Sequence, residues 1–241
     1  FCYALLIDSG GQNLKPNKKE VAKYFKKAAD KGHESSMFNY AIMLRNGEGI
    51  QSNKKEASNY FKLLADKGNV KAMFIYAIML DNGEGIKTDK KEAVRYYKMA
   101  SEEGNESAML NYAIMLKTGE GVPVNLNEAS HYYKILADKG ENLNAIFNYA
   151  LLLDSGGENF EPNKKEASKY YKKAADKGHE SAMFNYALML KKGEGIKENK
   201  KEAARYFKLL SDKGNREAML IYATMLDKGE GIQVDKNNAA R

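Results

Sequence analysis

A tyrosine recurs along this chain at an almost constant interval, and that period constrains the fold more than any other feature. Successive members of the series are 36 or 37 residues apart: Tyr3, Tyr40, Tyr76, Tyr112, Tyr149, Tyr186 and Tyr222. A fixed period between about 20 and 50 residues is typical of solenoids, in which each unit packs only against its neighbours. We therefore expect an array of repeated units rather than a single globular core.

The second half of each unit begins with a capping box. An Asn or Asp that can cap a helix is followed three residues later by a Glu that can reach back to the cap amide. The caps are Asn17, Asn53, Asp89, Asn125, Asn163, Asn199 and Asp235, and the glutamates are Glu20, Glu56, Glu92, Glu128, Glu166 and Glu202. Ala57, Tyr60, Phe61 and Leu64 then follow the spacing of a helix with one buried face. This pattern predicts an amphipathic second helix in every unit.

The first half of each unit is a helix that is apolar almost all round, as residues 72–80 (AMFIYAIML) illustrate. Such a helix has to lie between neighbours on several sides. All 20 glycines and all three prolines fall in the loops that join helices, so the helix interiors contain no breakers. The predicted fold is all-α, built from antiparallel helix pairs.

The array is expected to form one repeat domain over residues 1–241, with six complete second helices. Both ends fall inside repeats, so we expect further repeats beyond them. Residues 155–192 resemble residues 9–46, and residues 193–232 resemble residues 47–86. A block of four units therefore looks duplicated at an offset of 146 residues.

Residues 182–214 resemble the Sel-one-like repeat (SLR) family, which is related to the tetratricopeptide repeats. The matching positions are the loop Gly193, Glu194, Gly195 and Ile196, the cap Asn199, Ala203, the aromatic pair Tyr206 and Phe207, and the closing Gly214. The chain departs from the family pattern in the first helix, where Ala replaces the usual Gly and Tyr replaces Leu, as at Ala187 and Tyr186. The resemblance implies a right-handed α–α superhelix with about 36 residues per repeat, whose concave side is lined by the first helices. It also implies an adaptor or scaffold that mediates protein–protein interaction.

The sequence offers little for catalysis or for binding a cofactor or metal. His33, His131 and His179 are the only histidines, and they fall in different units. The Gly-Glu-Gly loops lack the Gly-Lys-Ser/Thr of a nucleotide-binding loop, so turn geometry explains them better. A single cysteine, Cys2, favours a reducing compartment, and no apolar run reaches the ~20 residues of a membrane span. We expect a cytoplasmic protein, with a secretory lumen as the alternative.

The best candidate for a binding site is a pair of columns on the first helices. The residue before each repeated tyrosine and the residue four positions later share one helix face. The columns are Asn39, Ile75, Asn111, Asn148, Asn185 and Ile221, beside Met43, Met79, Met115, Leu152, Met189 and Met225. An exposed ladder of amides and flexible apolar side chains suits an extended peptide. The alternative is that curvature of the array buries both columns against neighbouring units.

Two functions follow from these features. The first is a non-catalytic scaffold that binds a partner segment along the concave face. The second is a structural subunit that bridges a large assembly, with the lysine-rich second helices contacting acidic partners on the convex face. The net charge of +7 is spread evenly and the aromatic residues occupy core positions, so nucleic acid is a poor partner.

Overall fold

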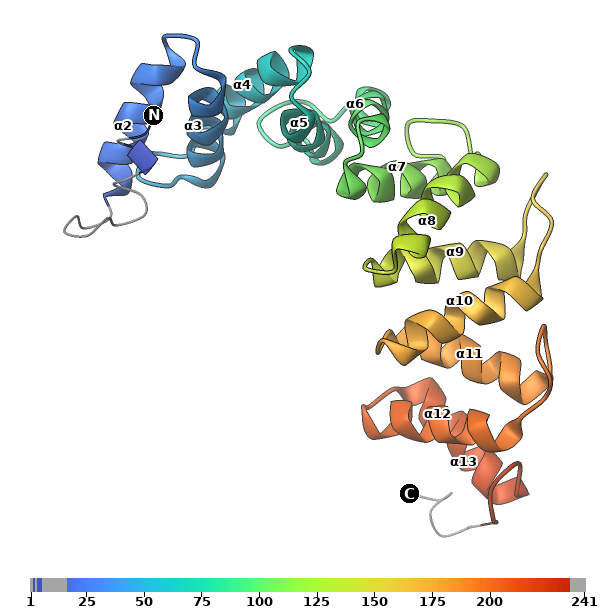
Figure 1. Ribbon diagram of the computed structural model, residues 1–241. Coiled ribbons are helices and arrows are strands. Elements are labelled where there is room, and N and C mark those ends of the chain that lie inside the picture. The colour runs from blue at the N-terminus through green and yellow to red at the C-terminus, as the bar shows by residue number, and fades with distance from the viewer. Residues whose placement is uncertain (1, 3, 6–16, 235–241) are drawn as a thin grey trace. The chain divides into compact units, whose positions relative to one another are not determined.

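The computed structural model describes residues 2, 4, 5 and 17–234, and within them it is all-α (Figure 1). Apart from one isolated bridge between Gly157 and Phe160, these residues form helices and loops. The helices are α2 (Lys18–Ala29), α3 (Glu34–Asn46), α4 (Lys54–Asp66), α5 (Val70–Asn82), α6 (Lys90–Glu102), α7 (Glu106–Thr118), α8 (Leu126–Lys139), α9 (Leu143–Ser155), α10 (Lys164–Asp176), α11 (Glu180–Lys192), α12 (Lys200–Asp212) and α13 (Arg216–Lys228). The predicted alternation of first helices (odd numbers) and second helices (even numbers) is confirmed.

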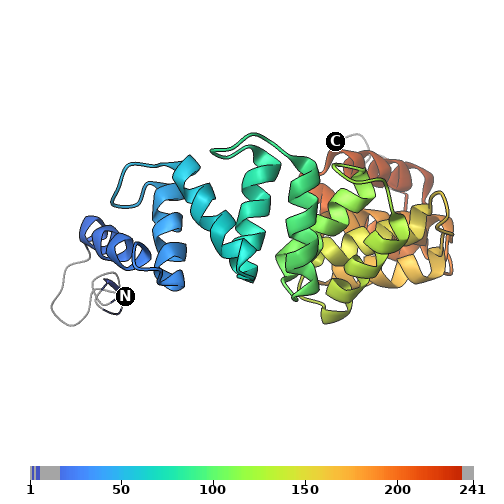
Figure 2. The same ribbon diagram turned by 90° about the horizontal axis from the view of Figure 1, so that it is seen from above.

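The chain divides into two compact units, Phe1–Val124 and Asn125–Arg241. Unit 1 contains α2 to α7, and unit 2 contains α8 to α13. Within each unit every helix packs against the next one along the chain. Figure 2 shows the helices of unit 1 following one another in a row. Units 1 and 2 are therefore each a stack of several helix-pair repeats, which is the expected architecture.

Side-chain caps begin both kinds of helix. The Asn53 Oδ1 accepts from the backbone amide of Glu56 at 3.0 Å, which confirms the predicted cap. The reciprocal bond differs from the predicted capping box, because the Glu56 carboxylate accepts from the Asn53 side-chain Nδ2 at 3.0 Å while the Asn53 backbone amide donates to the Leu44 carbonyl oxygen at 2.8 Å. The first helices are capped as well, a feature that the sequence reading missed. Asn69 Oδ1 accepts a hydrogen bond from the backbone amide of Ala72 at 2.9 Å at the start of α5. The Nδ1 atoms of His33 and His179 accept the equivalent amide hydrogen bonds at the starts of α3 and α11. Two of the three histidines are therefore structural caps.

The core runs along the contacts between first and second helices. Its small members are alanines with no exposed surface, such as Ala41, Ala77 and Ala187. Its large members include Phe61, Tyr97 and Phe207, each at most 1% exposed. The edge-to-face pair of Tyr76 and Tyr96, whose ring centroids are 4.9 Å apart, recurs in other repeats, for instance between Tyr149 and Tyr170 at 4.7 Å. Repetition of one packing scheme explains why the sequence period is so strict.

The second glycine of each Gly-Glu-Gly loop sets how closely successive repeats approach. A Cβ atom on Gly85 would lie 2.3 Å from the carbonyl carbon of Lys54, the first residue of α4 in the preceding repeat. Gly85 also has φ near +75°, in the left-handed region that favours glycine. The same approach occurs at Gly49, Gly121, Gly195 and Gly231. Turn geometry alone does not explain why the second loop position is glycine, because the close contact with the backbone of the preceding repeat also excludes a side chain there.

The loop of residues 156–163 between α9 and α10 is closed by hydrogen bonds of its own. In the loop of residues 156–163, Gly157 and Phe160 exchange backbone hydrogen bonds at 2.8 and 3.0 Å, and Asn159 has φ of +59°. Residues 9–16 and the predicted Asp235 cap lie outside the described residues. The four-unit duplication and the single domain over residues 1–241 therefore stay predictions.

Candidate functional site

The structure separates the two columns that were proposed as a binding strip. The methionine column is buried, with exposed fractions of 0 to 5%: Met43, Met79, Met115, Leu152, Met189 and Met225. The prediction of an exposed methionine strip is therefore wrong. These side chains lie on the same arc of the first helix as the alanines and tyrosines that contact neighbouring helices, so the packing between repeats covers them.

A different apolar column lies beside the asparagine column on the partly exposed face of the first helices, which we call the open face. It lies three positions after the asparagine column rather than four, and its apolar members are partly exposed: Ile42, Ile78, Ile114, Leu151 and Leu188. In α13 the position holds Thr224, whose hydroxyl donates to the Leu220 carbonyl oxygen at 2.8 Å. Ile114 is 37% exposed. The sequence could have identified this column as the exposed one, because the repeated alanine, tyrosine and methionine occupy one arc of the helical wheel and this column lies opposite that arc.

The asparagine column is half-buried at every position: Asn39, Ile75, Asn111, Asn148, Asn185 and Ile221. Two of its amides are oriented by buried tyrosines of the preceding second helix. Tyr97 is hydrogen-bonded to both Asn111 and Asp81; burial raises the pKa of Tyr97, and the Asn111 amide opposes that shift. An Asn side chain has two N–H donors and one carbonyl oxygen, so a single bond to tyrosine leaves bonding capacity for a partner.

The same arrangement recurs in unit 2. Tyr171 donates to Asp154 Oδ2 at 3.4 Å and is also bonded to the Asn185 side chain. Where the second-helix aromatic is Phe61 or Phe207, the column holds Ile75 or Ile221 instead. Part of the Asn–Ile alternation is therefore packing chemistry, since an amide is retained where a buried hydroxyl needs a partner. Asn39 follows Phe25 and departs from this rule.

The repeat around Tyr133 breaks the arrangement. Its hydroxyl is buried and has no hydrogen-bond partner among the described residues. Asp81 and Asp154 bond the equivalent tyrosines in other repeats, but the corresponding residue here is Lys117. The amide of Asn148, the asparagine of this repeat, donates to the carbonyl oxygen of Asn144 at 2.8 Å. The sequence thus keeps the tyrosine here but changes the acid that bonds it elsewhere.

A groove in unit 1 gathers the open-face residues of α5 and α7. Its volume is about 360 Å³, and it is lined by Ile78, Asp81, Asn82, Tyr97, Asn111, Ile114, Met115 and Glu120. Lys90 is hydrogen-bonded to Asp81 and lies 3.0 Å from Glu120, so both carboxylates already have a cationic partner. The groove therefore presents isoleucines and amides, with its acids compensated from within.

Ion pairs between repeats border the same open face. The Arg45 guanidinium donates twice to Glu84, at 3.0 Å to each carboxylate oxygen, and holds the pKa of Glu84 below its usual range. Lys191 lies 3.3 Å from Glu230 in unit 2. Each pair joins a first helix to the Gly-Glu-Gly loop of the following repeat, so these charges tie repeats together.

Over the residues that the structure describes, no group of three or more His, Cys, Asp or Glu side chains could hold a metal ion. In that same part of the chain no helix is both long and apolar enough to cross a membrane. The predictions about enzyme activity and compartment stay predictions.

The model of the Sel1 repeat matches seven consecutive segments: residues 8–33, 34–69, 70–105, 106–141, 143–179, 180–215 and 216–241. The chain belongs to the Sel1 repeat family. Sel1 repeat proteins generally mediate protein–protein interaction, and the family consists largely of non-catalytic scaffolds. From residue 34 onward each segment begins at the first residue of a first helix, so a complete Sel1 repeat is a first helix followed by its second helix.

Two solved structures share the fold. A Sel1 repeat protein from Oxalobacter formigenes is 25% identical, with a TM-score of 0.70 over 98% of this chain and 94% of its own. The antigen c5321 of uropathogenic Escherichia coli, which displays an SLR fold, is 22% identical, with a TM-score of 0.66 over 98% of this chain. This Sel1 repeat chain spans 58% of that antigen. No curated protein sequence matches the chain.

Proposed function

We propose that this protein is a non-catalytic scaffold that binds a partner segment along the open face of its first helices. The observation that supports the proposal is the oriented amide of Asn111 beside the partly exposed Ile78 and Ile114 in one groove. An amide held by Tyr97 can bond a peptide backbone without first losing side-chain freedom, which lowers the cost of binding.

The chemistry of the groove points to an extended peptide with apolar side chains. Ile78 and Ile114 offer apolar contact in the same groove as Asn111, and Lys90 compensates the charges of Asp81 and Glu120. The corresponding positions on other first helices, including Asn39, Asn148 and Asn185, would extend this surface within each unit.

A peptide-display selection on the full chain tests the proposal, with affinities of the selected peptides then measured by fluorescence anisotropy. We expect Ile114→Asp to weaken binding by about tenfold or more and Asn111→Ala by a few-fold. Leu63→Asp is the matched control, because Leu63 is 45% exposed but lies on the second helix α4. Selection of no peptide, or equal losses from Leu63→Asp and Ile114→Asp, would count against the proposal.

A further inference from the structure

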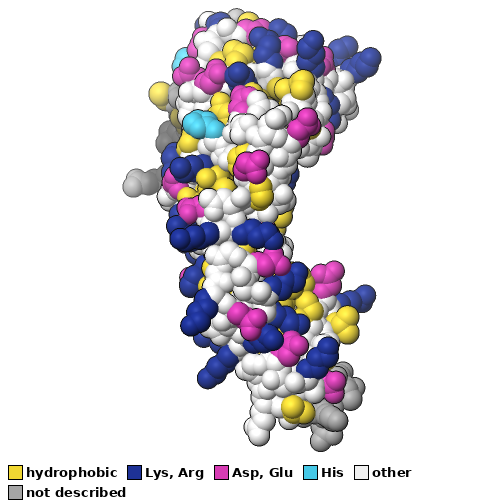
Figure 3. Space-filling view, turned by 90° about the vertical axis from the view of Figure 1, so that its right-hand side faces the viewer, with side chains coloured by type: hydrophobic (Ala, Val, Ile, Leu, Met, Phe, Trp, Pro, Cys, Tyr) yellow, Lys and Arg dark blue, Asp and Glu magenta, His cyan; other side chains and the backbone are white. Residues whose placement is uncertain are grey.

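The second helices carry many lysines, but most of this charge is compensated within the chain. Lysines pair with acids four residues later on the same helix, as in Lys62 with Asp66 at 2.8 Å and Lys172 with Asp176 at 2.8 Å. Figure 3 shows lysine and arginine side chains interspersed with aspartate and glutamate over one face of the molecule. Exposed pairs of this kind contribute little to stability, yet they reduce the attraction of the surface for an acidic partner.

One groove in unit 2 differs from this balanced surface. It lies between α10 and the loop of residues 193–197 and has a volume of about 560 Å³. Its lining residues are Lys165, Ser168, Lys169, Gly193, Gly195, Ile196 and Lys197. The lining thus contains three lysines and no carboxylate.

The acids around this groove are already occupied. Glu166 lies 2.7 Å from Lys169, Glu194 is paired with Lys164, and Glu198 lies 3.9 Å from Lys200. Lys165 and Lys197 are exposed, and neither has an ion-pair partner among residues 17–234. Two ammonium groups without a carboxylate partner therefore line a groove whose lining also includes Gly193 and Gly195.

The corresponding groove of the α6 repeat shows that the lysine excess does not occur in every repeat. The groove beside α6 has a volume of about 440 Å³ and is lined by Asp89, Lys91, Glu92, Val94, Arg95, Gly121, Val122 and Pro123. Arg95 donates to Glu92 at 2.6 Å, and Pro123 stands where unit 2 has Lys197. Two cations are thus matched by two carboxylates.

We propose that the α10 groove of unit 2 binds an acidic peptide segment of a partner protein. Carboxylates can be spaced along a peptide to meet Lys165 and Lys197, which gives charge complementarity at a site with no acid in its lining. A nucleic acid fits less well, because single strands also need rings on which to stack. Here Tyr170 packs against Tyr149 with ring centroids 4.7 Å apart, and Tyr171 is buried.

The site can be tested on the full chain by fluorescence anisotropy with a labelled peptide of consecutive glutamates. We expect binding that weakens as salt is raised, and little binding of the same peptide made with glutamine. The double variant Lys165→Glu/Lys197→Glu should weaken binding about tenfold or more. The matched control Lys91→Glu/Lys98→Glu changes the net charge equally on α6 and should leave the affinity within about twofold.

Three outcomes would overturn the proposal. The first is an absence of salt-sensitive binding of the glutamate peptide. The second is an equal loss of affinity in the control variant and the groove variant, which would indicate a net-charge effect. Tighter binding of a single-stranded oligothymidine than of the peptide would instead identify a nucleic-acid site. Because both lysines are exposed, circular dichroism of each variant should match that of the parent. This groove is separate from the first-helix face, so either proposal can fail without the other.

Discussion

Replacing Gly85 by alanine should reveal how strongly the backbone contact between repeats stabilises the array. Gly85 and Gly68 both lie in unit 1 and both have positive φ, near +75° and +90°. A Cβ atom at Gly68 would meet no heavy atom within 4 Å, whereas at Gly85 it would lie 2.3 Å from the Lys54 carbonyl carbon and 2.6 Å from the Lys55 amide nitrogen. The two substitutions therefore share the cost of backbone conformation and differ in the steric overlap.

The expected magnitudes follow from these two terms. An alanine in the left-handed region costs about 1–2 kcal/mol, which is all that we expect for Gly68→Ala. Overlap with a helix backbone cannot be relieved by rotating a side chain, and overpacking adds about 1–3 kcal/mol. Gly85→Ala should therefore lower the free energy of unfolding by about 2–5 kcal/mol in total.

Urea unfolding followed by far-ultraviolet circular dichroism measures both losses. The dependence of the unfolding free energy on urea concentration should be compared as well, because a weakened contact between repeats can reduce cooperativity. Equal losses for Gly68→Ala and Gly85→Ala would refute the reasoning, since the close approach to Lys54 would then cost nothing beyond the strained φ.

Two further predictions concern polar groups in unit 2. Tyr133→Phe removes a buried hydroxyl without a partner and should raise the free energy of unfolding by about 1 kcal/mol, whereas Tyr171→Phe breaks a bond to Asp154 and should lower it by about 1 kcal/mol. Urea unfolding of both variants checks this, and a loss for Tyr133→Phe would contradict it. Burial lowers the pKa of His179 below 6.5, so the unfolded chain binds more protons and stability should fall as the pH drops below that value. His179→Asn keeps a helix cap, as Asn69 does in α5, and should flatten the pH dependence of the urea midpoint; an unchanged slope would exclude His179 as the cause.

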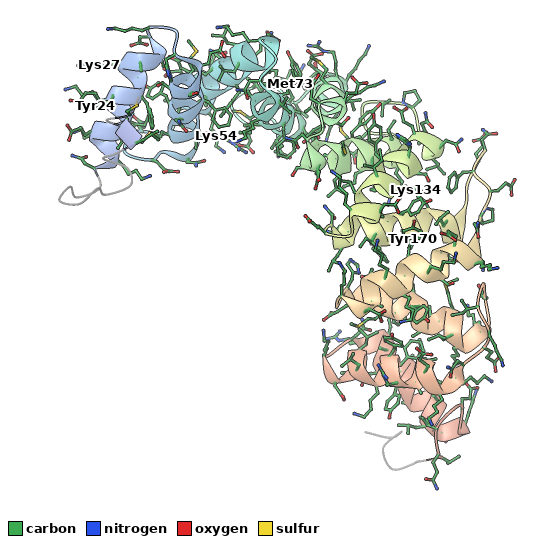
Figure 4. All side chains as sticks on the ribbon, in the orientation of Figure 1. Tyr24, Lys27, Lys54, Met73, Lys134 and Tyr170 are labelled. Carbon is green, nitrogen blue, oxygen red and sulfur yellow. The ribbon has the colours of Figure 1, made fainter. Side chains whose placement is uncertain are left out.

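Contacts of the aromatic residues also link neighbouring repeats. Tyr96 donates to Asp66 at 2.6 Å, and Tyr170, labelled in Figure 4, donates to Asp138 at 2.9 Å. In both cases the tyrosine belongs to one second helix and the aspartate to the end of the previous one. The hydroxyl groups therefore follow the repeat period, as the rings do.

The candidate site was only half predictable from the sequence. The asparagine column is partly exposed as predicted, because residues before a periodic tyrosine keep a fixed place on the helical wheel, and its role in binding stays a prediction. The neighbouring apolar column was predicted one position too late, at Met79 instead of Ile78. A helix that is apolar on all sides does not show from its sequence which arc is exposed to solvent. The bonds from Tyr97 to Asn111 and Asp81 join three different helices, and no local pattern reports them.

The sequence alone determined the period, the helix boundaries and the class of fold, because capping, glycine joints and apolar spacing are local and recur in every repeat. Only the tertiary structure decided which face of the first helix is open, why the second glycine of each loop cannot carry a side chain, and where lysines remain uncompensated. These properties depend on the distance between atoms of different repeats, such as Gly85 and Lys54, and packing fixes that distance.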